Sequence, residues 1–96
     1  MNLNEAQLKE IEELAGLFLE PEEIAVLLDL DADVFQEAIS NKKGAIWISY
    51  FRGKTISKKE VHANVVKLAR HGSPQAEELV AQMIHKQITA EKRGRR

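Results

Sequence analysis

The side chains of this chain with the clearest chemical potential are its cations, which are concentrated in the second part of the sequence. Residues 38–96 contain thirteen Lys and Arg against four Glu, a net charge of +9, whereas residues 1–37 contain eleven acidic residues against Lys9, a net charge of −10. The chemistry that such a division offers is electrostatic. It favours a polyanion partner for the basic part, or attraction between the opposite parts of different copies of the chain.

Eight of the cations form two clusters, one around Gly53 and one at the end of the chain. Cations that neutralise several phosphates give salt-sensitive binding to nucleic acid of any sequence. Charge runs like the first cluster are usually solvated faces, whereas the terminal cluster has little reason to exist for packing. The candidate phosphate contacts are Arg52, Lys54, Lys58, Lys59, Lys92, Arg93, Arg95 and Arg96.

No arrangement of residues in the sequence indicates catalysis. His62, His71 and His85 lack the paired spacing of a metal site, and Ser73 has no base placed by motif to activate it. The glycines are isolated, so no glycine-rich phosphate loop exists, and the lack of cysteine excludes disulfides and thiolate zinc sites. We therefore expect a binding protein that is not an enzyme and uses no metal or cofactor.

The composition favours a cytoplasmic protein. The acidic, amphipathic N-terminus lacks the basic and then apolar layout of a secretion signal. No apolar run approaches the roughly 18 residues of a membrane span, so no membrane partner is expected. A chain without cysteine also suits a reducing compartment.

Pro and Gly residues divide the sequence into segments with helical periodicity, and no segment has the alternating pattern of a strand. The sequence therefore predicts an all-α fold. Gly53 is expected to end a short helix, after which Ser57 and Glu60 fit a capping box for the next. Three parts are expected: an acidic domain at 1–43, a helical segment at 44–90 and a frayed basic tail at 91–96. The predicted helices span about 5–19, 21–28, 32–42, 45–52, 57–72 and 74–90.

Helix starts and buried faces follow from local residue chemistry. Asn4, Asp31 and Ser73 are suited to cap helices, and Pro21 and Pro74 to occupy the first helical position. Apolar residues spaced by three and four predict one buried stripe on each helix. The side chains expected to face inward in the first three helices are Leu8, Ile11, Leu14, Ala15, Phe18, Ile24, Ala25, Leu27, Leu28, Val34, Phe35, Ala38 and Ile39.

The segment PEEIAVLLDLDADVFQEAI has the pattern of a helix-turn-helix. Its first helix needs a small residue where the second approaches, and Ala25 is that residue. Leu30 is expected to plug the turn and Phe35 to pack the second helix back. The turn position often filled by glycine is Asp29, which tolerates a left-handed backbone less freely. With the preceding helix, residues 5–43 resemble the three-helix, homeodomain-like version.

The second helix of this motif begins with acidic residues, which is unusual for a helix that reads DNA. Asp31 and Asp33 open it and Glu37 follows, and carboxylates beside phosphates cost affinity. Two interpretations stay open: the acids only cap a solvated helix, or DNA is contacted from its middle and end. The candidate contacts there are Gln36, Ser40, Asn41, Lys42 and Lys43.

The acidic helix-turn-helix, the small all-helical chain and the segment IWISYFRGKTISKKEVHANVVKLARHGSPQAEELVAQMI together are similar to bacteriophage DNA-packaging proteins. The family that the chain resembles is the small terminase subunit with its short phage or prophage relatives. The shared features are an aromatic-x-x-G-K stretch (YFRGK, 50–54) that leads into a helix ending in A-x-x-G-S-P (ARHGSP, 69–74). The resemblance covers roughly residues 20–88.

The resemblance implies a phage-encoded protein that recognises viral duplex DNA for packaging. Such subunits assemble as rings and hand DNA to a separate, large ATP-hydrolysing motor subunit. The helix-turn-helix would contact DNA through the five candidates named above, and a helical hairpin at about 57–88 would join copies into a homo-oligomer. The acidic start of the second motif helix departs from this expectation and puts direct base reading in doubt.

Two other functions fit the same residues. One is a helical adaptor or structural protein, whose acidic motif binds a basic protein partner. The other is a dimeric transcription regulator. The sequence also leaves open whether Trp47 and Phe51 belong to the core or to an interface.

Overall fold

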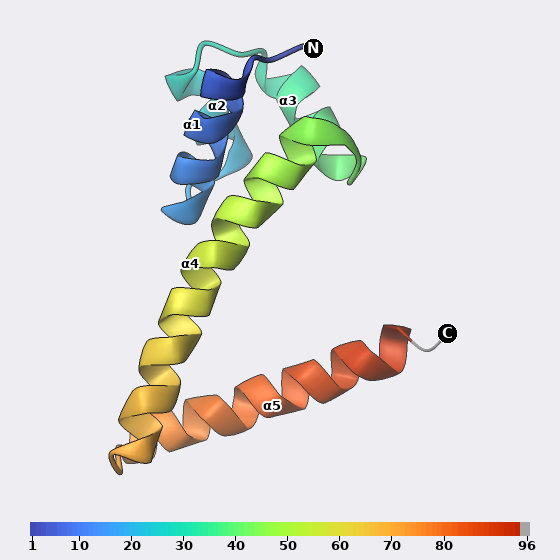
Figure 1. Cartoon of the computed structure of the whole chain (residues 1–96). Helices are drawn as coiled ribbons and strands as arrows, with labels where there is room; N and C mark the ends of the chain where they lie inside the picture. The colour runs from blue at the N-terminus through green and yellow to red at the C-terminus, as the bar shows by residue number, and fades with distance from the viewer. Residues whose placement is uncertain (95–96) are drawn as a thin grey trace. The chain divides into compact units, whose positions relative to one another are not determined.

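A computed structural model describes residues 1–94 and confirms that this part of the chain is all-α (Figure 1). Within these residues there are five helices and no strand. They form two compact units, residues 1–59 (the first unit) and residues from Glu60 onward (the second unit). No helix among residues 1–94 combines the length and apolar character needed to cross a membrane. The helices are α1 (Glu5–Gly16), α2 (Pro21–Leu27), α3 (Ala32–Ser40), α4 (Gly44–Arg70) and α5 (Pro74–Gly94).

The predicted starts of α1, α2 and α3 are confirmed. The Asn4 carboxamide oxygen accepts a hydrogen bond from the backbone N–H of Gln7 (2.8 Å), and the Gln7 side chain accepts one from the N–H of Asn4 (2.9 Å). The Asp31 carboxylate accepts a hydrogen bond from the N–H of Val34 (2.9 Å) at the start of α3. Pro21 is the first residue of α2, where a missing N–H costs nothing.

Each of these three helices ends in a left-handed residue that is not glycine. Phe18, Asp29 and Lys42 have φ angles of 63°, 54° and 54°, and each follows directly on the C-cap residue of its helix. A side chain in this conformation places its Cβ close to the following carbonyl, at a cost of about 1 kcal/mol. Glycine would make the same turn without that cost.

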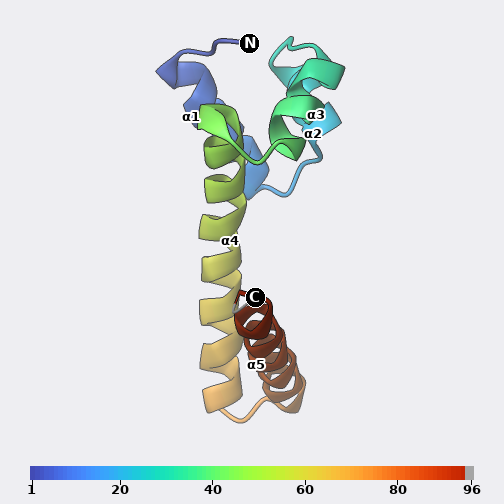
Figure 2. The same cartoon turned by 90° about the vertical axis from the view of Figure 1, so that its right-hand side faces the viewer.

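The core of the first unit lies between α1, α2, α3 and the first turns of α4 (Figure 2). Its largest fully buried side chains are Phe35, Ile11 and Ile24. The prediction that Ala25 and Phe35 face inward is therefore confirmed, but Phe18, Leu27 and Val34 are 56%, 60% and 41% exposed. α1 ends before Phe18, and the seven-residue α2 makes only two turns. The periodic pattern therefore did not predict that Phe18 and Leu27 are exposed.

The predicted break at Gly53 is wrong, because α4 runs without interruption through this residue. Gly53 is buried, and a Cβ placed on it would lie 2.0 Å from the carbonyl oxygen of Glu12. The glycine therefore allows the backbones of α1 and α4 to approach closely. The predicted capping box of Ser57 and Glu60 is wrong as well, because both residues lie inside α4. Ser57 lies beside Gly16 of α1.

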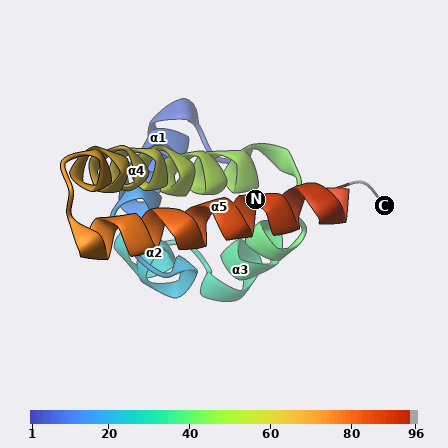
Figure 3. The same ribbon diagram turned by 90° about the horizontal axis from the view of Figure 1, so that it is seen from below.

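The second unit contains the end of α4, a turn at residues 71–73 and α5 (Figures 1 and 3). Ser73 caps α5 as predicted, because its hydroxyl accepts a hydrogen bond from the N–H of Ala76 (3.3 Å). α5 extends to Gly94, beyond the predicted end near residue 90. Lys92 and Arg93 stabilise this last turn because their charges oppose the negative end of the helix dipole.

Candidate nucleic-acid interface

The predicted contacts of α3 lie on its solvent-exposed side and in the turn that follows. Gln36 and Ser40 are one turn apart, and the Gln36 amide donates a hydrogen bond to the Ser40 hydroxyl (3.1 Å). Asn41 is the C-cap of α3, and Lys42 and Lys43 complete the turn. All five residues are exposed, so their polar atoms are accessible to a ligand.

The acidic residues of α3 gather at its other end. The Asp31 carboxylate is engaged in capping, and Asp33 lies in the first turn, where the positive end of the helix dipole stabilises it. Asp33 and Glu37 are exposed. α3 therefore has an acidic start, and the charges of Lys42 and Lys43 favour an anion at its other end.

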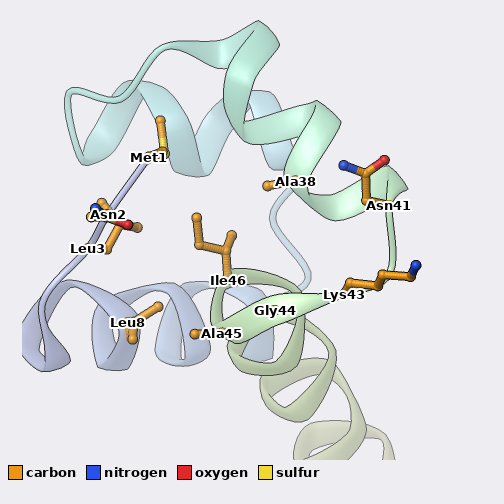
Figure 4. A pocket seen from close by; sticks show the side chains of 10 residues that line it. All are labelled: Met1, Asn2, Leu3, Leu8, Ala38, Asn41, Lys43, Gly44, Ala45 and Ile46. Carbon is orange, nitrogen blue, oxygen red and sulfur yellow. The ribbon is translucent and has the colours of Figure 1, made fainter.

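A pocket next to this cationic end was not predicted from the sequence. Figure 4 shows Asn41 and Lys43 at its rim, with the Lys43 side chain extending away from Met1 and Leu8. No sequence pattern indicated that the N-terminal residues come next to the end of α3, because this depends on packing between distant segments. Its lining is Met1, Asn2, Leu3, Leu8, Ala38, Asn41, Lys43, Gly44, Ala45 and Ile46.

The cluster around Gly53 is not a loop, and the helix divides it between two faces. Arg52 and Lys59 are seven residues apart and share one face of α4, whereas Lys54 and Lys58 are four residues apart and share another. The structure therefore does not bring these four cations together.

Two of these cations have partners within the first unit. The Arg52 Nε atom lies 3.9 Å from a Glu12 carboxylate oxygen, a long and largely exposed ion pair that contributes little. The Lys54 ammonium lies 5.2 Å from the centre of the Tyr50 ring, a cation–π distance. Burial and, to a smaller extent, the negative charge of Glu20 raise the pKa of the Tyr50 hydroxyl above its usual value.

The terminal cluster begins within α5. Lys92 and Arg93 are exposed in its last turn, and the predicted contacts Arg95 and Arg96 lie outside the described residues. Within residues 1–94, no three His, Asp or Glu side chains come together in a way that would hold a metal ion.

Trp47 and Phe51 form a stacked pair on the surface of α4. Their ring centroids are 5.1 Å apart and their planes differ by 8°. Phe51 is half exposed, and neither residue belongs to the buried core of the first unit. The sequence left open whether these two residues belong to the core, and in the first unit they lie outside it.

Comparisons of the chain with protein-family models, with curated proteins and with solved structures found no match.

Proposed function

We propose that this chain is a DNA-binding, self-associating protein of the small-terminase type, with no catalytic activity of its own. The observation that carries the proposal is the connection between α2 and α3. Leu30 donates its backbone N–H to the carbonyl of Ala25 (2.8 Å), across a turn in which Asp29 is left-handed. Ala25 is completely buried, as the small contact residue of a helix-turn-helix has to be.

In this proposal α3 contacts duplex DNA with its second part. The turn at Lys42 and Lys43 binds phosphates, and Gln36, Ser40 and Asn41 lie beside it within reach of the backbone or of base edges. Because Asp33 and Glu37 repel phosphates, binding depends on the cations and is weakly selective for sequence.

Self-association is supported by the apolar side chains of the second unit. Among its described residues only Ala76 is buried, although α5 is 21 residues long. Most of the stability of a helix in a protein comes from tertiary packing of its apolar face. Other copies of the chain would cover the exposed residues, which are Val61, Leu68, Leu79, Ile84 and Ile88.

The test is a mobility-shift titration of the full chain with duplex DNA at increasing salt. We expect binding at about 50 mM salt that weakens steeply as salt rises, as counterion release requires. The Lys42→Ala/Lys43→Ala variant should bind more weakly than a Lys9→Ala/Lys86→Ala control, which loses the same charge from exposed positions elsewhere. Complete absence of binding at about 50 mM salt overturns the DNA function.

Native mass spectrometry separates the proposed assembly from a dimeric regulator of transcription. Masses well above a dimer at micromolar concentration support the packaging type, a dimer supports the regulator, and a monomer contradicts both.

The exposed acids of α3 favour one competing function, an adaptor that binds a basic protein. Asp33 and Glu37 are not engaged in salt bridges within the described residues. An adaptor would bind basic peptides through these carboxylates and would give no shift with DNA in the same titration.

A further inference from the structure

We propose that the first units of different copies associate head to tail, with Leu17 and Phe18 of one copy inserted into an apolar groove on α4 of the next. The inference deepens the proposed self-association and rests on it. Both sides of the contact are surfaces of this chain, and the groove of one copy is occupied by a second copy.

Leu17 and Phe18 form an apolar protrusion, which we call the knob. They are 71% and 56% exposed, and Phe18 has a φ of 63°. The hydrogen bonds that close α1 here are made by backbone atoms, since Phe18 donates its N–H to the carbonyl of Ala15 (2.9 Å). Neither packing within the unit nor the turn explains a phenylalanine at this position, where glycine would be unstrained.

The groove lies on the outer face of α4. The stacked Trp47 and Phe51 rings contribute to its lining together with Ile48 and Ile56, which are 44% and 46% exposed. A contiguous exposed apolar face is typical of an interaction site. The groove is lined by Trp47, Ile48, Phe51, Arg52, Thr55 and Ile56.

The charges beside the two surfaces are opposite. Glu13 lies one helical turn before Leu17, and Glu20 follows Phe18 by two residues, both exposed. Arg52 lines the groove and is 62% exposed despite its long ion pair with Glu12, and the exposed Lys59 shares its face of α4. Contact between the knob and the groove therefore joins acids to cations.

The same charges disfavour symmetric pairing. Contact between two grooves would place Arg52 and Lys59 of one copy beside those of the other. Contact between two knobs would place Glu13 and Glu20 of one copy beside those of the other. A head-to-tail contact leaves one free knob and one free groove, so copies continue to add and form a ring if the rotation between them closes, or a filament if it does not.

The test uses two full-length variants, each lacking one side of the contact, in sedimentation measurements of weight-average mass. Phe18→Asp places a charge in the knob and keeps the groove, whereas Phe51→Glu places a charge in the groove and keeps the knob. We expect each variant alone to have a lower mass than the wild type at equal concentration. We expect an equimolar mixture to have a higher mass than either variant alone, because one intact knob meets one intact groove.

Two further variants separate a disrupted interface from a disrupted fold. Leu27→Asp changes another exposed apolar residue of the first unit, 60% exposed and outside both surfaces, and should keep the wild-type mass. Phe18→Gly removes the larger side chain of the knob and relieves the left-handed strain. Its mass should therefore fall, while its thermal midpoint should rise at a concentration where the wild type is dissociated. Circular dichroism checks that every variant keeps its helix content.

A wild-type mass for Phe18→Asp, or a mixture no heavier than its components, overturns the head-to-tail contact alone. A monomeric wild type at micromolar concentration overturns the proposed self-association as well. DNA binding by the variants is measured separately in the salt titration, so a failure of the DNA function is distinguished from a failure of the knob-and-groove interface.

Discussion

Gly53 of α4 lies against the main chain of Glu12 in α1, and a Cβ on the glycine would be 2.0 Å from the Glu12 carbonyl oxygen. The contact is with backbone, so no side-chain rotation relieves it. Gly16 contributes from the other side, because a Cβ on it would be 2.9 Å from the Ser57 hydroxyl. Two glycines and a serine thus set the distance between the helices.

Gly53→Ala is therefore expected to lower the free energy of unfolding by about 2 kcal/mol. Overpacking costs up to about 3 kcal/mol, and the gain in helix propensity offsets about 1 kcal/mol of it. Urea denaturation followed by circular dichroism at fixed protein concentration measures the change. Gly94→Ala is the control, since open space surrounds that position, and it should change stability by no more than about 0.5 kcal/mol. Equal stability of both variants contradicts the close approach.

Ala25→Leu should push α2 and α3 apart and lower the free energy of unfolding by about 1–3 kcal/mol. Ala25 is completely buried, so the added atoms have no open space to occupy. Thermal and urea denaturation report the destabilisation. Ala6→Leu, at an exposed position of α1, should be close to neutral. An unaltered stability of Ala25→Leu would mean that the residue is not the small contact of a helix-turn-helix.

Tyr50 should titrate above its usual pKa of about 10, because burial and then the charge of Glu20 disfavour the tyrosinate. The unfolded chain loses this proton at a lower pH than the folded chain. The contribution of Tyr50 to stability is therefore complete below pH 10 and is lost as pH rises from there through the folded pKa. The chain has one tyrosine, so its ultraviolet absorbance gives the titration directly. Glu20→Gln should lower the pKa, and Glu22→Gln should not.

Replacing Lys92, Arg93, Arg95 and Arg96 by Ala should weaken DNA binding to a similar extent for all sequences. Every phosphate that is no longer neutralised should reduce the slope of log affinity against log salt by about 0.9. The mobility-shift titration measures this slope. A variant that also loses four exposed cations, from Lys9, Lys67, Arg70 and Lys86, controls for net charge. A slope equal to that of the wild type refutes a role for the basic tail.

Phe18→Gly should raise the free energy of unfolding of the dissociated protein by about 1 kcal/mol, because glycine adopts the left-handed conformation without strain. The measurement is urea denaturation at a concentration where the wild type is dissociated, since assembly would add to the apparent stability. A destabilised variant would show that the Phe18 side chain packs within its own unit.

The parts of the fold that depend on short-range chemistry were predictable from the sequence. The caps at Asn4, Asp31 and Ser73 need only a side-chain oxygen three residues before a free N–H, and all three are present. The all-α class followed from periodicity in the same way. Gly53 was misinterpreted because its role depends on Glu12, some forty residues earlier in the chain, and a local pattern does not contain that contact.

The candidate interface was predictable in its residue types but not in its arrangement. Lys42 and Lys43 lie in the turn beyond the C-cap of α3, whereas the sequence predicted Lys42 as the last residue of that helix. Arg52 and Lys58 were grouped on the assumption of a loop, and the continuous α4 places them on different faces. The exposure of Phe18 was not predicted, because it follows Ala15 by three residues, which is the spacing of a buried stripe. In the structure α1 ends at Gly16, before this position.

The three left-handed helix ends respond differently to evolutionary selection for heat tolerance. At Asp29 a mutation to glycine would relieve strain without loss of function, since this side chain belongs neither to the proposed DNA contact nor to the knob. At Lys42 the same gain would remove a cation from the proposed DNA contact, and at Phe18 it would remove the knob. Lineages adapting to higher temperature should therefore acquire glycine at 29 first and retain bulky or charged residues at 18 and 42.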